Sequence, residues 1–209
     1  MTGPLLIIKQ LGIQSYAQVY AAMQEFTRTR DANTEDQIWL LQHPRVFTLG
    51  RNAKEHHVLT PGNIPLHNID RGGQVTYHGP GQLVAYLLFD IRRKGLGVRE
   101  TVTLIENSLI DFLAEYEIRA YAKKDAPGVY TDEGKIAALG LRVSKGCCYH
   151  GLSLNIKMDL EPFTRINPCG YEGLNVVQVA EYFPTITLPM ASNTLLNCLN
   201  HRFAIKYYD

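Results

Sequence analysis

The sequence predicts an α+β protein, and two observations favour that class. Segments typical of strands and of helices interleave along the chain without the regular βαβ repetition that builds a parallel sheet. No Gly-x-Gly-x-x-Gly run follows a strand, as a dinucleotide-binding fold would require. The 209 residues, 45% of them hydrophobic and 20% charged, fit one globular domain that spans residues 1–209.

The first half of the chain combines short strands with one helix. The apolar run at residues 5–8 predicts a strand, and residues 37–42 predict another that stops at His43-Pro44, because proline cannot donate to a sheet. Residues 46–50 resume extended structure. Between the first two strands a helix begins after Ser15, its predicted N-cap. The apolar residues of this helix recur at helical spacing and predict core packing: Tyr16, Val19, Tyr20, Met23 and Phe26.

The second half begins with a long apolar strand at residues 83–90 and a helix at residues 98–116, whose apolar residues again recur at helical spacing. Three short strands follow Pro127-Gly128. A tight-turn signal at residues 132–134 joins the first two of them in a hairpin, with Lys135 near its tip. The three strands are predicted at residues 129–131, 135–143 and 148–156, and the last helix is predicted at residues 193–203.

The stretch from Arg71 to Gln82 organises the rest of the chain. It reads Arg-Gly-Gly-Gln-Val-Thr-Tyr-His-Gly-Pro-Gly-Gln, which contains too many glycines for a helix interior. Its glycines allow positive φ angles and close approach of a ligand to the backbone, while its polar side chains supply hydrogen-bond donors and acceptors. A hairpin turn between two strands is the simpler alternative. The density of functional side chains favours a binding loop.

Three motifs, in the same order along the chain, resemble those of the lipoyl(octanoyl) transferases. They are the stretch Arg71–Gln82, the segment Gly134-Lys135-Ile136-Ala137 through Gly140-Leu141-Arg142, and Ile166-Asn167-Pro168-Cys169-Gly170. The resemblance extends from His43-Pro44 to the region of Gly173. It implies the catalytic-domain fold of the biotin and lipoate protein ligases, in which helices flank a mixed β-sheet.

The resemblance also implies the reaction. Members of this family transfer an octanoyl (or lipoyl) group from acyl carrier protein to the ε-amine of a lysine on a lipoyl domain, as the first step of endogenous protein lipoylation. The expected partners are therefore octanoyl-acyl carrier protein and the lipoyl domains of 2-oxoacid dehydrogenases and of glycine cleavage H protein. We expect no ATP and no metal, because the sequence has neither a phosphate-binding loop nor a cluster at metal-ligand spacing.

Cys169 and Lys135 are the predicted catalytic residues. Cys169 lies in a loop between a stiff proline and a glycine, so its thiol can meet a substrate. Lys135 precedes an apolar run, so its amine can project into a pocket where burial disfavours the ammonium form. The alternative is a solvated lysine at a hairpin tip, and the match to the family's catalytic lysine decides against it. We expect Cys169 to carry the acyl group as a thioester and Lys135 to act as the base.

The resemblance assigns binding of the acyl and pantetheine groups to three segments. These comprise Arg71, Gly72, Gly73, Gln74, Val75, Thr76, Tyr77, His78, Ala138, Leu139, Gly140, Gly151, Leu152 and Ser153. Ser153 stands where alanine is common in the family and adds a hydroxyl near the acyl pocket. His43 and His150 are candidate supporting residues, with a hydrogen-bonded structural histidine as the alternative for each. We predict no role for His56, His57 or His67.

Composition excludes several other classes. The net charge of +1 argues against binding nucleic acid mainly through phosphate contacts. No apolar run approaches the roughly 20 residues that cross a bilayer, and the start of the chain lacks the pattern of a signal peptide. We therefore expect a soluble, cytoplasmic protein that does not enter membranes.

The cysteines and the basic clusters have simpler interpretations. The four cysteines show neither metal-ligand nor disulfide-scaffold spacing and are expected to be thiols, with Cys147 and Cys148 as small strand residues. The clusters Arg92-Arg93-Lys94 and Lys123-Lys124 are either solvated surface or contacts for an acidic partner such as acyl carrier protein.

Two other functions remain open on the sequence. An ATP-dependent lipoate or biotin protein ligase would share the fold, a Gly-rich loop and a lysine, but would need no nucleophilic cysteine. A non-catalytic module that binds acylated carrier protein would explain a pocket and the basic clusters, but would leave Lys135 and Cys169 without a role. The Asn-Pro-Cys-Gly setting of Cys169 favours the transferase over both.

Overall fold

The computed structural model describes residues 6–204; Leu5 of the first predicted strand and Met1–Pro4 lie outside them. The larger of two sheets contains β1 (Leu6–Ile13), β2 (Asp36–Gln42), β6 (Gln82–Asp90), β7 (Tyr121–Lys123), β8 (Ala126–Tyr130), β9 (Lys135–Ser144) and β10 (Cys147–Asn155). The smaller sheet contains β3 (Val46–Leu49), β4 (Leu66–Asn68) and β5 (Val75–His78). The helices are α1 (Tyr16–Thr29), α2 (Val98–Ala114) and α3 (Leu188–Phe203), with 3-10 turns η1 (Glu55–His57), η2 (Glu161–Arg165), η3 (Pro168–Gly170) and η4 (Val179–Glu181).

Both sheets are mixed. The strand order is β1-β2-β6-β10-β9-β8-β7 in the larger sheet and β4-β3-β5 in the smaller one. The pairs β1–β2 and β3–β4 are parallel, and every other neighbouring pair is antiparallel. The predicted hairpin between β8 and β9 is confirmed, because the Thr131 N–H donates to the Gly134 carbonyl across the turn at 2.8 Å.

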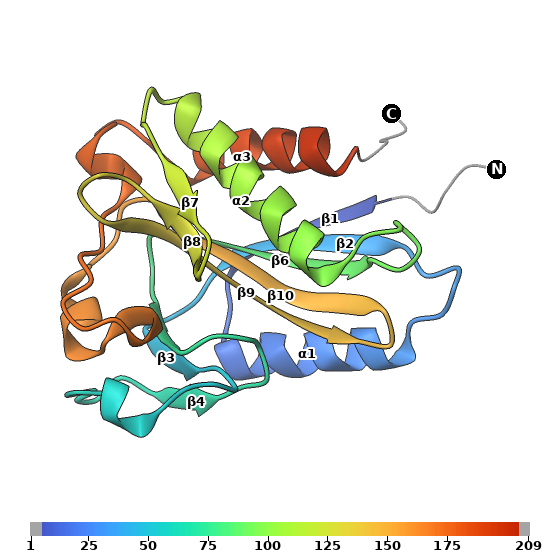
Figure 1. Ribbon diagram of the computed structural model, residues 1–209. Coiled ribbons are helices and arrows are strands. Elements are labelled where there is room, and N and C mark those ends of the chain that lie inside the picture. The colour runs from blue at the N-terminus through green and yellow to red at the C-terminus, as the bar shows by residue number, and fades with distance from the viewer. Residues whose placement is uncertain (1–5, 205–209) are drawn as a thin grey trace.

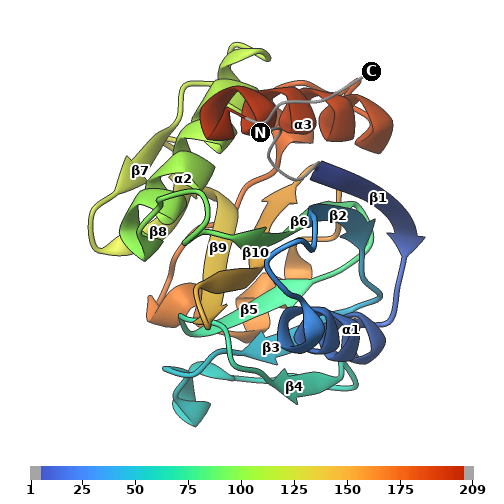
Figure 2. The same cartoon turned by 90° about the vertical axis from the view of Figure 1, so that its right-hand side faces the viewer.

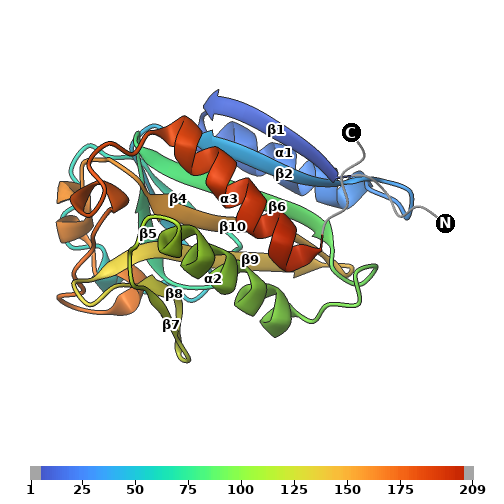
Figure 3. The same cartoon turned by 90° about the horizontal axis from the view of Figure 1, so that it is seen from above.

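The helices enclose the larger sheet from both sides. Helices α2 and α3 cover one face, while α1 covers the other face beside the smaller sheet (Figures 1 and 2). Seen from above, α2 and α3 lie side by side across the strands (Figure 3). The main core lies between this helix pair and the sheet, and a second core lies under α1. Strand β6 is buried along its whole length, which explains its continuous apolar sequence.

The three predicted helices are present, but their starts differ in detail from the prediction. Helix α1 follows Ser15 as expected, yet the Ser15 side chain makes no capping hydrogen bond. Helix α3 begins earlier than predicted, because Thr187 caps it by accepting a hydrogen bond from the Met190 N–H. Pro189 lies in the first turn, where its missing N–H costs no helical hydrogen bond.

The predicted binding loop at residues 71–82 contains a strand that the sequence analysis missed. Residues 75–78 form β5, which pairs antiparallel with β3 along its whole length. The ring of Tyr77 packs into the core of the smaller sheet against Phe47 and Phe163. Strand pairing and this packing fix β5, so only residues 71–74 form a loop before it.

The basic cluster Arg92-Arg93-Lys94 is in large part structural. The Asp36 carboxylate, which is buried, accepts from Arg93 Nη2 at 2.8 Å and lies 3.3 Å from Lys94 Nζ. It also accepts from the buried guanidinium of Arg30 at 2.7 Å. Two of the three cations of this cluster, expected to be solvated surface or partner contacts, therefore neutralise an internal carboxylate that joins β2, the end of β6 and the end of α1.

We expect Asp36→Asn to lower the free energy of unfolding by about 3–5 kcal/mol, because it leaves the buried Arg30 guanidinium without its counter-charge. Urea unfolding followed by circular dichroism measures the change. The control is Glu25→Gln, which breaks the exposed Glu25–Arg28 pair on α1 and should change stability far less. Equal losses in the two variants would show that Asp36 is not a structural counter-ion.

Candidate active site

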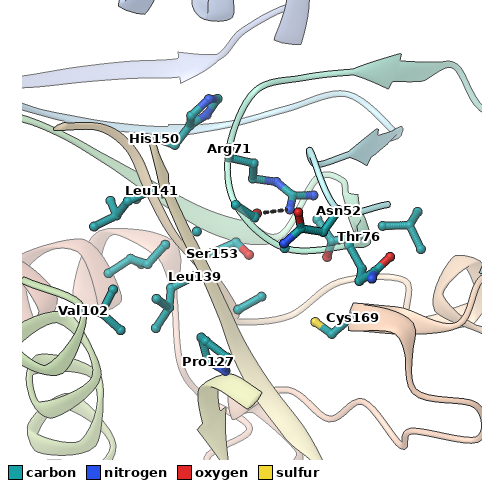
Figure 4. Close-up of a pocket in the computed structure, with 18 of the residues that line it drawn as sticks. Asn52, Arg71, Thr76, Val102, Pro127, Leu139, Leu141, His150, Ser153 and Cys169 are labelled. Atoms are coloured by element: carbon teal, nitrogen blue, oxygen red, sulfur yellow. Dashed lines mark hydrogen bonds between the residues drawn. The ribbon is translucent and has the colours of Figure 1, made fainter. Parts of the chain in front are cut away.

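A cavity of about 380 Å³ opens where three chain segments meet: the 71–76 segment, the paired strands β9 and β10, and the loop that carries Cys169 (Figure 4). The start of α2 and the turn between β7 and β8 complete its wall. The residues predicted from the sequence that line it are Arg71, Gly72, Gly73, Gln74, Val75, Thr76, His78, Ala138, Leu139, Gly140, His150, Gly151, Leu152, Ser153 and Cys169.

Strand register brings two of the predicted binding segments together. In the antiparallel pairing of β9 with β10, residues 138–140 lie directly opposite residues 151–153. The 71–74 loop then docks on this pair, because the Gly72 N–H donates to the Leu141 carbonyl at 3.0 Å. A Cβ atom at Gly140 would lie 3.0 Å from the Gly72 carbonyl oxygen, so glycine permits this close approach.

Three predicted residues lie outside the cavity lining: Tyr77, His43 and Lys135. The ring of Tyr77 faces the smaller core, because side chains alternate along β5 and its neighbours Thr76 and His78 face the cavity. His43 is fully buried behind the wall, where its ring nitrogens contact the Gln14 carbonyl at 2.7 Å and the Tyr86 hydroxyl at 2.8 Å. Burial lowers the pKa of His43 to about 4, so its ring is neutral and supports the cavity wall through Tyr86.

The Lys135 Nζ atom lies 3.0 Å from the Cys169 Sγ atom. Lys135 begins β9 and is only 4% exposed, so it is not a solvated lysine at a hairpin tip. Its backbone N–H donates to the Asn175 carbonyl at 2.9 Å, and its carbonyl accepts from the Val177 N–H at 3.0 Å. The segment 175–177 therefore covers this end of the hairpin and turns the lysine inward.

The thiol of Cys169 is presented by a constrained turn. Cys169 has φ 57°, a left-handed conformation that a non-glycine residue adopts at a cost of order 1–3 kcal/mol. The turn is tied down by His57, whose carbonyl accepts the Asn167 N–H at 2.8 Å. Gly170 also has a positive φ, and a Cβ there would lie 3.2 Å from Gln74. His57, to which the sequence analysis gave no role, thus anchors the turn that carries Cys169.

The Lys135 side chain packs against the Pro127–Gly128 part of β8. Its Nζ atom donates to the Pro127 carbonyl at 2.9 Å and lies 5.0 Å from the centre of the Tyr130 ring. A Cβ at Gly128 would come within 2.7 Å of Nζ, so only glycine leaves room. Burial lowers the pKa of Lys135, but Cys169 and Tyr130 raise it by more, and the net pKa lies above the ordinary value. The pair therefore favours an ammonium beside the sulfur.

The cation that lines the cavity is Arg71, which has no carboxylate partner in the described range 6–204. The Arg71 guanidinium donates to the carbonyl and hydroxyl of Thr48 at 2.9 Å each and to the Gly72 carbonyl at 2.9 Å. These acceptors are neutral. Burial lowers the pKa of Arg71, and the nearby Tyr16 and Cys169 oppose that effect. The cavity wall is therefore electropositive near Arg71.

His150 lies apart from the thiol, as Figure 4 shows. Its Nε2 atom is 3.0 Å from Asp70 Oδ1, and the second carboxylate oxygen of Asp70 accepts from the Tyr149 hydroxyl. Burial raises the pKa of Asp70, but its hydrogen bonds lower it by more, so the net pKa lies below the ordinary range. Burial lowers the pKa of His150. A neutral His150 that donates to an ionised Asp70 fits both shifts, and the pair shapes the cavity wall away from Cys169.

Several lining residues were missed or had been predicted as core. Tyr16 packs in the core with Val46 and Ile69, as its helical spacing predicted, and it also lines the cavity, as does Val102 of α2. Pro127 and Tyr171 also line it and carry no local signal of this role. Within residues 6–204 no group of three or more His, Cys, Asp or Glu side chains could hold a metal ion, and no helix is long and apolar enough to cross a membrane.

Solved structures share the fold at low sequence identity. A crystal structure of lipoate-protein ligase A bound with ATP matches with a TM-score of 0.78 and 13% identity, over 100% of this chain and 88% of that chain. Biotin protein ligase from Aquifex aeolicus matches with a TM-score of 0.57 and 12% identity, over 96% of this chain and 70% of that chain. The predicted α+β architecture of mixed sheet and flanking helices is confirmed.

Sequence relatives are much closer. The family model of the lipoyl protein ligase A/B catalytic domain matches residues 15–200. The octanoyltransferase of Hahella chejuensis is 55% identical over 92% of this chain and 86% of its own length. That of Colwellia psychrerythraea is 60% identical over 84% of this chain and 75% of its own length. The chain belongs to the octanoyltransferases, the acyltransferases of protein lipoylation, within the lipoyl protein ligase A/B catalytic-domain family.

Proposed function

We propose that this enzyme moves the octanoyl group in two steps, first from acyl carrier protein to Cys169 and then from Cys169 to the ε-amine of a lysine on a lipoyl domain. The single observation that carries the proposal is the 3.0 Å contact between Lys135 Nζ and Cys169 Sγ at the edge of a mostly apolar cavity. A thiol with an adjacent proton acceptor is the usual arrangement of covalent acyl transfer.

In the first step, the Cys169 thiolate attacks the thioester carbonyl of octanoyl-acyl carrier protein. The tetrahedral intermediate collapses, the bond to the pantetheine sulfur breaks, and that sulfur leaves as a thiol with the proton of the Lys135 ammonium. The net result is an octanoyl thioester on Cys169 and a neutral Lys135 amine. The raised pKa of Lys135 supports this starting state, because the ammonium is the form that holds a thiolate and can donate a proton.

In the second step, the acceptor lysine attacks the Cys169 thioester as a neutral amine. Lys135 accepts a proton from the attacking amine, the amide bond forms, and the Cys169 sulfur leaves as thiolate. The enzyme returns to its ammonium–thiolate pair. Exchange of one thioester for another is nearly balanced, and amide formation then draws the reaction forward.

The partners follow from this chemistry and from the family. The donor is octanoyl-acyl carrier protein, and the acceptors are lipoyl domains of 2-oxoacid dehydrogenases and of glycine cleavage H protein. A related fold from Thermoplasma acidophilum is described as a bi-partite lipoate protein ligase and its E2 lipoyl domain, which supports a lipoyl domain as the acceptor. The acyl chain would lie against Ala138, Leu139 and Leu152, which line the cavity.

We expect Cys169→Ser to reduce octanoyl transfer to a lipoyl domain by at least about 10³-fold, because the variant loses the thiolate nucleophile. Cys169 is half-buried in a loop, so the fold should persist. Intact-mass measurement after mixing with octanoyl-acyl carrier protein should show one octanoyl adduct on the wild type and none on the variant. Cys147→Ala is the control and should keep both adduct and turnover. Near-normal turnover by Cys169→Ser would eliminate the covalent mechanism.

Lys135→Met and Lys135→Arg separate the two roles of the lysine. Methionine removes both charge and proton acceptor, so the midpoint of Cys169 alkylation by a small reagent should move to higher pH. Arginine keeps a positive charge but cannot accept a proton, so alkylation should stay closer to wild type while transfer to the acceptor amine fails. If Lys135→Met leaves the alkylation midpoint unchanged, Lys135 does not tune the thiol.

We also expect transfer from purified octanoyl-acyl carrier protein to proceed without ATP and to survive EDTA. The donor thioester is already activated, so no adenylate is required. The measurement is octanoyl transfer to a lipoyl domain with and without added ATP and magnesium, after dialysis against EDTA. A requirement for nucleotide with this donor would instead support an ATP-dependent ligase.

A further inference from the structure

A buried carboxyl group lies behind the catalytic pair on helix α2. Glu106 is only 8% exposed. Within residues 6–204 it forms no salt bridge, and its side chain makes one hydrogen bond, in which Oε1 accepts from the Gly128 N–H at 3.1 Å. Burying a carboxyl group without a charged partner costs free energy. The position of Glu106 therefore indicates a functional role.

The hydrogen bond of Glu106 and that of Lys135 fall on the same peptide group. The amide that joins Pro127 to Gly128 offers its N–H to Glu106 and its carbonyl to Lys135 Nζ, which lies 2.9 Å away. In a trans peptide these two groups point in opposite directions. Glu106 and Lys135 therefore hold one peptide from its two sides, and Lys135 in turn contacts Cys169.

We infer that Glu106 is a positioning residue for the Lys135–Cys169 pair and acts through the Pro127–Gly128 peptide, an inference that rests on the proposed thiol chemistry. An ionised Glu106 polarises the peptide so that the Pro127 carbonyl becomes a better acceptor. It also places a negative charge behind Lys135, which favours the ammonium and hence the thiolate. The peptide fixes the direction of the Nζ atom, since the lysine lies against Gly128.

Other charged and titratable groups also face the Lys135–Cys169 pair. Tyr130 of β8 contacts Lys135 through its ring, and Lys123 Nζ of β7 lies 4.3 Å from the centre of that ring. Arg71 faces the Cys169 side. Burial raises the pKa of Glu106 by more than the Gly128 N–H and Lys135 lower it, so the net pKa lies above the ordinary value of a carboxyl group. Glu106 is the carboxyl group that contacts the same peptide as Lys135, so its loss should act on Lys135 first.

The test is the pH dependence of single-turnover octanoyl transfer from the carrier to Cys169, followed by rapid quench and intact mass. As the pH is raised, the rate should first rise because the Cys169 thiolate forms, and then fall because the Lys135 ammonium loses its proton. In Glu106→Gln the peptide hydrogen bond can persist but the negative charge is gone, so the ammonium loses support. The alkaline limb of this variant's pH–rate profile should move to lower pH by about one unit, as expected for the loss of a nearby unit charge.

Two further variants test the inference. Glu106→Asp retains the charge, so its alkaline limb should lie closer to wild type than that of Glu106→Gln. Glu115→Gln removes an exposed carboxylate beyond the end of the same helix and should leave both limbs in place. A folded Glu106→Gln with a wild-type alkaline limb, or equal shifts in Glu106→Gln and Glu106→Asp, would overturn the inference. Failure of the proposed function would look different, since the wild type itself would then form no acyl-enzyme.

Discussion

The site depends on one contact between a strand and a loop, Lys135 Nζ to Cys169 Sγ, formed by residues that are 34 positions apart. Hydrogen bonds from neighbouring segments fix the position of each of these two residues. Lys135 is fixed by backbone hydrogen bonds to the 175–177 segment, and Cys169 by a turn whose Asn167 N–H is anchored on His57. A buried lysine with no acceptor, or a thiolate with no cation, would be costly in this apolar setting. Each group thus compensates for the burial of the other.

Close approach explains much of the unusual composition around the pair. Gly128 leaves space for the Lys135 side chain, Gly140 lets the 71–74 loop contact β9, and Gly170 leaves room for the Gln74 side chain beside the turn that carries Cys169. These glycines lie on different segments, and at each of them a Cβ atom would crowd a neighbouring segment. Arg71 lines a cavity that is otherwise mostly apolar, and Lys135 lies beside it in contact with Cys169. Such a wall suits an acyl chain and the anionic species that form during its transfer.

Much of the fold could be predicted from the sequence, because apolar spacing determined where helices and strands lie. One strand that was missed, β5, is hidden among glycines and is fixed by pairing with β3, a contact that no local pattern reveals. The role of Arg93 and Lys94 was also misjudged, because their partner Asp36 is distant in sequence. In the site, the motif residues were predicted through family resemblance. His57 and Glu106 were not, because they act through backbone groups of Asn167 and Gly128, and sequence spacing carries no signal for such contacts.

The central claim is that the octanoyl group passes through Cys169 on its way to the acceptor lysine. The most direct measurement is a chase: octanoyl-enzyme freed of carrier protein is mixed with a lipoyl domain, and the loss of enzyme adduct and gain of acceptor adduct are followed by rapid quench. We predict that both change together, at a rate no slower than steady-state turnover. An adduct that persists while added octanoyl-acyl carrier protein still supports full turnover would contradict it, because the thioester would then lie off the reaction path.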